Sequence, residues 1–256
     1  MITTKINYEI HSEVIDLSYA ISEGMNKYPK DPSPQVEIIP ARDENGAIYS
    51  GFTVLHLKSH HGTHIDAPAH KINGGKTIDQ YTPEKFIATA GLVDLTKYAT
   101  CSIAPRGFVE VVEPEMLETE INLMDKFFPI QSMEALILRT GYDQTISSWA
   151  KSSGVFPYLS PKAAEYICSL NLPLKLIGID SQSVDKRSSN SEVHREFLSR
   201  DILVLETLVN LHTLADKAKD KLFQLHAAPV NYLKADAAQC RAYAIVDLGR
   251  GEGKGR

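Results

Sequence analysis

Short aliphatic and β-branched runs recur along the whole chain, and they limit its possible folds more than any other feature of the sequence. Each run has the length of a β-strand, and most of the runs end in a polar or turn-forming residue, which favours strands over helices. The runs are Val14–Leu17, Val36–Ile39, Thr53–Leu57, Gly91–Leu95, Ala135–Leu138, Lys175–Ile179, Ile202–Leu205 and Tyr243–Leu248. We therefore expect strands over the full length of the chain.

Helix signals lie between these runs. Thr82-Pro83-Glu84 and Ser160-Pro161-Lys162 each place a capping hydroxyl before a proline at the first helical position. A short helix is predicted over Ala163–Leu170, and a second helix, capped by Ser191, would carry His194. Because strands outnumber helices and the two are mixed along the chain, we expect an α/β fold in which residues 1–248 form one domain without a linker.

Two segments depart from this pattern. Tyr98–Phe128 is the least regular stretch, and we interpret it as either an insertion or a dimerisation arm. The tail, residues 249–256, alternates glycine with charged residues, so it has nothing to bury and is expected to be a flexible end.

Composition narrows the classes of function. The 256 residues are 43% apolar and 23% charged, which is typical of an ordinary globular protein. The formal net charge of −5 offers no basic excess to phosphates, so we expect no nucleic-acid partner. No run approaches the roughly 18 apolar residues of a membrane span, and the N-terminal segment lacks the apolar region of a signal peptide. Since Cys101, Cys168 and Cys240 form no C-x-x-C pair, we expect reduced thiols in a soluble, cytoplasmic protein.

Histidine is concentrated in one short segment. Five of the nine histidines lie close together, at His56, His60, His61, His64 and His70. Three of them, His60, His64 and His70, form with Asp66 the skeleton H-x3-H-x-D-x3-H, which such a composition produces by chance in roughly one sequence in a thousand. Two imidazoles and a carboxylate are what a catalytic Zn²⁺ or Mn²⁺ takes from a protein while positions stay open for water. The alternative is a solvated histidine-rich loop, or core histidines bonded to the backbone.

The segment does not follow the H-E-x-x-H pattern of zinc proteases. His61 stands where that pattern needs glutamate, and Gly62 and Pro68 disfavour a continuous helix. A strand that runs into a tight loop fits better. Further along the chain, His194 and Glu206 form a second pair, for which a salt bridge to lysine or arginine and a metal site are both compatible with the pattern.

The string from His60 to His70 resembles the signature H-x-G-T-H-x-D-x-P-x-H of the cyclase / kynurenine formamidase family of metal-dependent hydrolases and matches it in full. The resemblance extends roughly from Val14 to Leu248. Other segments that are similar to family motifs are Asp16-Leu17-Ser18, Tyr28-Pro29-Lys30-Asp31, Leu138-Arg139-Thr140-Gly141, Gly178-Ile179-Asp180, Ser183-Val184-Asp185 and His194-Arg195. Lys30 replaces the glycine of the family's aromatic-P-G-D turn, and His61 is an additional histidine that is either a solvated bystander or a contact of a ligand.

The resemblance implies a site and a fold. The implied metal ligands are His60, His64, Asp66, His194 and Glu206. Asp66 would bridge two ions, His70 would be the general acid/base, and Tyr28 would line the substrate pocket. The implied cofactor is one to two divalent ions per chain, Zn²⁺ or Mn²⁺. The implied fold is a swivelling β/β/α domain with mixed sheets, usually assembled as a homodimer or higher homo-oligomer.

The leading hypothesis is a metal-dependent hydrolase that uses metal-activated water to cleave a small acyl-amide or cyclic amide, as an arylformamidase or an isatin hydrolase does. His70 would pass a proton to the leaving nitrogen. A serine or cysteine nucleophile is disfavoured, because G-x-S-x-G is absent and no cysteine lies in the histidine cluster. Two alternatives stay open: a cyclase or dehydratase of secondary metabolism on the same metal site, and a non-catalytic protein that binds a metal or small molecule.

Overall fold

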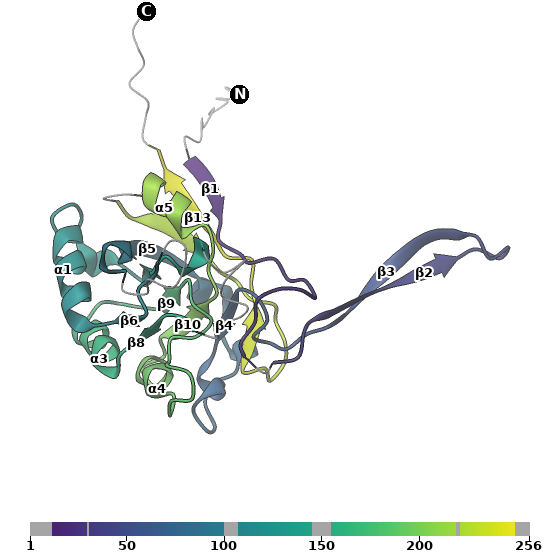
Figure 1. Cartoon of the computed structure of the whole chain (residues 1–256), viewed down its shortest axis with the longest axis horizontal. Helices are drawn as coiled ribbons and strands as arrows, with labels where there is room; N and C mark the ends of the chain where they lie inside the picture. Colours follow the sequence, from purple (N-terminus) through teal and green to yellow (C-terminus); the bar gives the residue numbers. More distant parts are fainter. Residues whose placement is uncertain (1–11, 30, 100–106, 145–154, 219–220, 249–256) are drawn as a thin grey trace, which may run out of the picture.

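The computed structural model describes residues 12–29, 31–99, 107–144, 155–218 and 221–248 (Figure 1). Three features named from the sequence, Lys30, Cys101 and the 249–256 tail, lie outside the described residues. The two cysteines that are described, Cys168 and Cys240, are free thiols. Within the described residues, no helix is both long enough and apolar enough to cross a membrane.

A nine-stranded mixed sheet forms the centre of the described chain, in the order β1-β13-β11-β5-β7-β9-β10-β4-β12. Its strands are β1 (Ser12–Asp16), β4 (His64–Asp66), β5 (Ile87–Asp94), β7 (Ala135–Arg139), β9 (Leu176–Ile179), β10 (Leu203–Glu206), β11 (Phe223–His226), β12 (Ala237–Gln239) and β13 (Tyr243–Asp247). Strands β5, β7, β9 and β10 are parallel, whereas the flanking pairs are antiparallel. Two smaller ladders pair β2 (Gln35–Arg42) with β3 (Ile48–His56) and β6 (Val111–Val112) with β8 (Tyr158–Leu159).

The predicted strands are confirmed, because each aliphatic run of the sequence falls on a strand of the structure. The strands that no aliphatic run predicted are β4, which was expected from the histidine segment instead, and β6, β8, β11 and β12. All five are two to four residues long. Segments this short carry too few residues for a periodic pattern, and they are extended because their neighbours supply hydrogen-bond partners.

Two hydrophobic cores cover the two faces of the central sheet. Alternation along β7 sends Ile137 into one core and Leu136 and Leu138 into the other. The helices α1 (Pro114–Met124), α3 (Pro161–Ser169) and α4 (Glu192–Leu198) pack on the second of these faces, and α5 (Leu211–Lys217) contributes to the first. Helices on both faces of a mixed sheet confirm the expected α/β class (Figure 1).

The helix signals of the sequence have different outcomes. The Ser160 hydroxyl accepts a hydrogen bond from the Ala163 amide and caps α3, as predicted. Ser191 does precede α4, but its φ of +58° is left-handed and its side chain makes no capping bond, so the predicted cap is wrong. At Thr82 the structure has only a short 3₁₀ turn, Pro83–Phe86, without a side-chain cap, because strand β5 begins directly after it.

The expectation of an irregular Tyr98–Phe128 segment is also corrected. Its described part contains α1, in which Leu117 and Ile121 are almost completely buried in the core. Residues 100–106 of the segment lie outside the described residues. The described part of this segment is therefore packed against the body and does not project as an arm.

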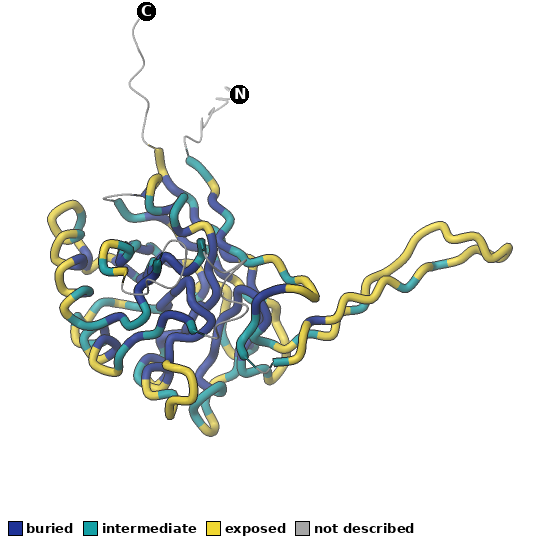
Figure 2. The backbone as a smooth tube through the Cα atoms, viewed as in Figure 1, coloured by how far each residue is buried: buried dark blue, intermediate teal, exposed yellow. Residues whose placement is uncertain are grey.

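The element that does project is the β2–β3 hairpin, which we call the hairpin arm (residues 35–56). It extends far from the body in Figure 1, and nearly all of it is exposed in Figure 2. Its exposed apolar side chains are Val36, Ile38, Ile48, Tyr49, Phe52 and Leu55. An isolated two-stranded hairpin is marginally stable in water, so this arm lacks the packing that such an element normally needs.

Candidate active site

Strand β4 positions two of the predicted ligands. Side chains alternate along a strand, so His64 and Asp66 point to one face while Ile65 points to the other. Ile65 is completely buried in the core, which fixes the direction of its two neighbours. The side chains of His64 and Asp66 are 2% and 0% exposed. The H-x-D spacing of the sequence is therefore the spacing of adjacent same-face residues in a buried strand.

The turn before β4 depends on Gly62. Its φ is +73°, and a Cβ at this position would approach Ile21 Cγ1 to 2.9 Å. The Gly62 carbonyl accepts a hydrogen bond from His64 Nδ1 at 2.8 Å. This bond turns His64 Nε2 toward the interior of the site. The predicted strand joined to a tight loop is present here.

Strand β10 and helix α4 supply the second pair of predicted ligands. Glu206 ends β10, and its Oε1 accepts a hydrogen bond from the Val184 amide at 2.9 Å. Thr207 follows with φ +59°, a strained conformation for a β-branched residue, and the chain turns away sharply. His194 lies on α4 with its Nε2 3.2 Å from Glu206 Oε1. The ion-pair partners of Glu206 are thus the histidines His194 and His64. A lysine or arginine bridge to Glu206, which was the alternative, is absent among the described residues.

The carboxylate of Asp66 lies between the two groups of ligands. Its Oδ1 is 2.9 Å from His60 Nδ1 and 3.4 Å from His64 Nε2. Its Oδ2 is 3.1 Å from His194 Nε2. The structure therefore brings together five residues that are up to 146 positions apart in the chain, with Asp66 in the middle.

The charges in this cluster are strongly coupled. Burial lowers the pKa of His60, but the charge of Asp66 and the hydrogen bond to Asp236 outweigh it and raise the pKa to about 9. A similar balance, dominated after burial by Asp66, raises the pKa of His64 to about 10. Burial raises the pKa of the Asp66 carboxyl, yet His60 and His64 hold it well below its usual value. The buried carboxylates therefore create a strong demand for positive charge.

The residues fit a divalent cation. His64 Nε2 and Asp66 Oδ1 are buried and make no well-aligned hydrogen bond among the described residues, although they lie at ion-pair distances from charged neighbours. Buried polar atoms of this kind are costly unless something binds them. Imidazole nitrogens and carboxylate oxygens of His60, His64 and Asp66 lie within 4.8 Å of one another. Nitrogen and oxygen donors at this spacing are what Zn²⁺ and related ions accept.

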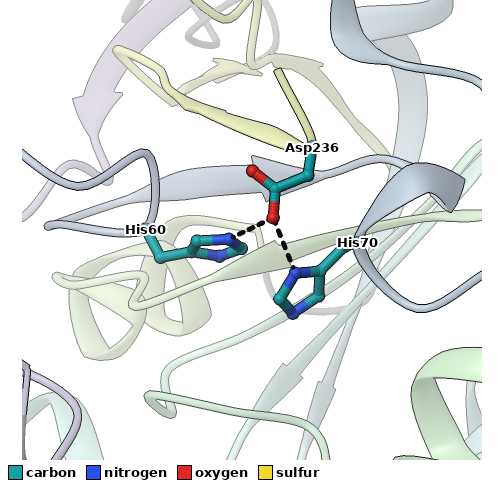
Figure 3. A group of neighbouring side chains, drawn as sticks. All are labelled: His60, His70 and Asp236. Carbon is teal, nitrogen blue, oxygen red and sulfur yellow. Dashed lines mark hydrogen bonds and ion pairs between the residues drawn. The ribbon is translucent and has the colours of Figure 1, made fainter. Parts of the chain in front are cut away.

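A carboxylate that the sequence did not indicate, Asp236, lies beside the cluster (Figure 3). Its Oδ2 is 3.0 Å from His60 Nε2 and 3.0 Å from His70 Nδ1. His70 ends a short 3₁₀ turn, Pro68–His70, and its Nε2 is 3.9 Å from Asp66 Oδ2. His70 thus lies next to the cluster, and its Nδ1 is hydrogen-bonded to Asp236 while its Nε2 faces Asp66.

A second unpredicted carboxylate holds His194. Asp185 Oδ2 is 2.5 Å from His194 Nδ1, and the Asp185 carboxylate also accepts hydrogen bonds from the amides of Val193 and His194. Asp185 was visible in the S-x-D string of the sequence, although no role was assigned to it. Asp236 has no histidine, aspartate or glutamate close to it in the sequence, so no local pattern of ligand residues identified it.

Tyr28 lines the cavity of the site, whereas His61 lies behind its wall. The site opens into a cavity of about 360 Å³, and Tyr28 lines it with its ring 5.7 Å from that of Phe156. His61 is 2% exposed, so it is not a solvated bystander. Its Nε2 hydrogen-bonds to the Pro32 carbonyl at 3.0 Å and its Nδ1 accepts from the Lys58 amide. These two hydrogen bonds join the loop at Pro32 to the loop at Lys58, a residue that lines the cavity.

Comparisons with known proteins agree on one family. A family model described as "Putative cyclase" matches residues 15–186, more than half of the chain. A kynurenine formamidase of Bacillus cereus is 26% identical over 232 residues, which cover 90% of this chain and 96% of that protein. The crystal structure of an isatin hydrolase bound to the product analogue thioisatinate has a TM-score of 0.75 at 21% identity, over 92% of this chain and 93% of that one. A structure described as a potential metal-dependent hydrolase with cyclase activity has a TM-score of 0.68 at 19% identity, over 92% and 98% of the two chains. The chain belongs to the Cyclase family.

Proposed function

We propose that this chain is a metal-dependent hydrolase that cleaves a small acyl-amide or cyclic amide with activated water. The observation that carries the proposal is the position of Asp66, whose two carboxylate oxygens face different donors. Oδ1 faces His60 and His64, and Oδ2 faces His194. A carboxylate with donors on both sides suits a shared ligand between two divalent ions, which lie about 3.5–4 Å apart in two-metal hydrolases.

The chain offers a complete ligand set for such ions. We assign His60, His64 and Asp66 to one ion and Asp66, His194 and Glu206 to the other. When bound, a divalent ion lowers the pKa of water toward neutrality and polarises the carbonyl that the water attacks. The donors suit Zn²⁺ and Mn²⁺ alike, at one to two ions per chain.

His70 is the group that we assign to proton transfer. Asp236 accepts a hydrogen bond from Nδ1, so the other nitrogen, Nε2, is directed toward the cluster and the cavity. As water adds to the carbonyl carbon, Nε2 takes the proton that the water loses. The same nitrogen then delivers this proton to the amide nitrogen as the C–N bond breaks. The products are a carboxylic acid and an amine.

The cavity supports a small substrate that has an aromatic part. Its volume of about 360 Å³ lies at the lower end of the usual range for ligand pockets. The ring of Tyr28, which packs at a tilt against Phe156, gives the wall a flat apolar surface. The relatives named kynurenine formamidase and isatin hydrolase favour hydrolysis over the ring-closing or dehydrating alternative.

A substrate panel tests this function. Purified protein would be assayed with N-formylkynurenine, isatin and simple aryl formamides, and its metal content would be measured on the same sample. We expect turnover of at least one panel member, its loss with a chelator, and its return with Zn²⁺ or Mn²⁺. Stoichiometric metal without any turnover would contradict the hydrolase and leave a binding protein or a cyclase.

We also propose that the chain works as a homodimer or a higher homo-oligomer, with the hairpin arm lying on a second copy. Directly paired strand residues share a face, so Val36 and Leu55 lie on one face of the arm and Ile39 and Phe52 on the other. Apolar side chains on both faces need cover from outside the arm. A second copy of the chain is the simplest partner, because it would cover both arms by symmetry.

A further inference from the structure

Asp236 contacts two imidazoles that have different tasks in the proposed function. Its Oδ2 is 3.0 Å from Nε2 of His60, a proposed ligand, and 3.0 Å from Nδ1 of His70, the proposed acid/base (Figure 3). We propose that Asp236 is a positioning residue that fixes the tautomer and orientation of both imidazoles with one oxygen. The part of this inference that concerns His70 rests on the proposed function. The effect of Asp236 on the metal site through His60 does not.

The first argument is the direction of the ring nitrogens. An ionised carboxylate only accepts hydrogen bonds, so each nitrogen that faces Asp236 must carry a hydrogen. The neutral ring then has its lone pair on the opposite nitrogen. For His60 this is Nδ1, which lies 2.9 Å from Asp66 Oδ1; for His70 it is Nε2, which points toward the cluster. Both lone pairs are thereby directed to the place where the chemistry is proposed.

The second argument is that Asp236 is itself held by the sheet. It directly precedes β12, whose first residue, Ala237, is paired with Asp66 of β4. The Asp236 carbonyl accepts a hydrogen bond from the Ala67 amide at 2.9 Å, and its Oδ1 accepts one from the Ser59 hydroxyl at 3.1 Å. The backbone of Asp236 is thus joined to the strand that carries the ligands. Its carboxylate is 42% exposed but anchored at both oxygens.

The third argument is that the other two histidine ligands, His64 and His194, have hydrogen-bond partners of their own. His64 is fixed by the Gly62 carbonyl and His194 by Asp185, so each has its own partner. His60 and His70 share theirs, and their ring centroids are only 4.2 Å apart. Partners behind metal ligands affect metal affinity or activity by 10–100-fold when they are removed. A shared partner should affect both properties together.

The test compares Asp236→Asn and Asp236→Ala with the matched control Asp201→Asn. Asp201 is 44% exposed and also accepts hydrogen bonds from three side chains, those of Tyr81, Lys85 and Lys76, but it does not line the cavity. Three quantities would be measured: Zn²⁺ affinity by competition with a chromophoric chelator, kcat and KM at saturating Zn²⁺, and the ¹⁵N shifts of the imidazoles in the Zn²⁺-loaded protein. Thermal unfolding would report on the general loss of stability.

We expect Asp236→Ala to weaken Zn²⁺ binding by about 10–100-fold and, once Zn²⁺ saturates, to lower kcat by a similar factor with little change in KM. The ¹⁵N shifts should show that His70 loses its fixed Nδ1–H tautomer. Asp236→Asn, which keeps the shape without the charge, should give smaller changes in the same direction. Asp201→Asn should lower the melting temperature about as much as the Asp236 variants do, and it should leave Zn²⁺ affinity and kcat unchanged.

Unchanged Zn²⁺ affinity and unchanged tautomers in a folded Asp236→Ala variant would overturn the inference. Loss of a whole equivalent of Zn²⁺ at saturating concentration would also overturn it, because Asp236 would then be a ligand. The proposed function fails separately: if the wild-type protein hydrolyses no panel member while affinity and tautomers still depend on Asp236, the positioning role stands and the hydrolase does not.

Discussion

His64 and Glu206 lie directly opposite each other on the antiparallel strands β4 and β10, although they are far apart in the sequence. Directly opposed residues share a face, and this brings His64 Nε2 to 3.5 Å from Glu206 Oε2. Asp66 lies two residues along β4 and points to the same face. The strand register thus sets the spacing between the two groups of ligands. A shift by one residue would turn Ile65 into the site and both ligands of β4 into the core.

Asp66→Ala should be the most damaging single substitution for metal binding. Asp66 faces donors on both sides, so its loss removes a ligand from each proposed ion and leaves the two cations without a shared negative charge. Glu206→Gln is the comparison, because it removes the charge of a ligand assigned to one ion only. Elemental analysis should find essentially no metal in Asp66→Ala and up to one equivalent in Glu206→Gln. Full occupancy in Asp66→Ala would refute the bridging arrangement.

His70→Ala should separate proton transfer from metal binding. The hydrogen bond of the His70 ring goes to Asp236, and its Nε2 stays 3.9 Å from Asp66, so its removal should leave the metal and the fold in place. A general acid/base contributes about 10²–10⁴-fold to the rate, and we expect a loss of kcat on this scale. His226→Ala, at a histidine on β11 outside the cavity, is the control and should keep full activity.

The choice of leaving group sharpens this prediction. An activated ester needs little protonation of its leaving group, so His70→Ala should slow its hydrolysis less than that of an amide. Parallel kcat measurements on an aryl formamide and a nitrophenyl ester would check the difference. Equal losses for both substrates would argue against proton transfer, and depletion of metal would make His70 a ligand.

Tyr28→Ala should weaken binding of aromatic substrates more than it weakens the fold. The Tyr28 ring lines the cavity and is only partly buried, so the substrate gains from stacking on it. Such contacts are worth about 0.5–1.5 kcal/mol beyond burial, which corresponds to a rise in KM of roughly 2–12-fold. Tyr28→Phe keeps the ring and should keep KM. If Tyr28→Ala instead lowers the melting temperature strongly at constant KM, the ring is a core residue.

Metal-free protein should lose stability as the pH rises above neutral. The pKa values of His60 and His64, about 9 and about 10, lie above the ordinary value of 6.5. The folded state favours the protonated rings. Their contribution to the free energy of unfolding is therefore complete below pH 6.5 and is lost as the pH passes through 9 and 10. In the metal-loaded protein the rings bind as neutral ligands, so this loss should disappear. Thermal unfolding of both forms across this range is the measurement, and identical pH trends in the two forms would contradict it.

Much of the site could be predicted because it is locally encoded. The spacing of His60, His64 and Asp66 follows from one loop and one strand, and the strand pattern of the core follows from aliphatic runs such as Ala135–Leu138. His194 and Glu206 have no local signal that joins them to this segment. Their assignment needed the family resemblance, since the sheet order that brings β10 beside β4 is a property of the whole fold.

Other features could not be predicted from the sequence for physical reasons. Asp236 acquires its role through the pairing of β12 with β4, and β12 has only three residues, too few for a periodic signal. The hairpin arm was predicted as two strands, but whether a hairpin packs on the body or projects from it depends on tertiary contacts. Tyr98–Phe128, which was interpreted as an insertion or a dimerisation arm, carries α1 in its described part.

The hairpin arm should hold two copies of the chain together. Ile38 is 72% exposed and Phe52 is 59% exposed, and they lie on opposite faces of the arm. Burial of each such side chain is worth about 1.5–3 kcal/mol, so Ile38→Asp combined with Phe52→Asp should weaken self-association by about 100-fold or more. Glu44→Gln, at the exposed turn of the same arm, is the matched control and should leave association unchanged. Size-exclusion chromatography with light scattering should give a dimer or a larger oligomer for the wild type and the control, and a monomer with intact metal content for the double variant. A monomeric wild type, or a double variant with the wild-type mass, would show that the arm does not hold the copies together.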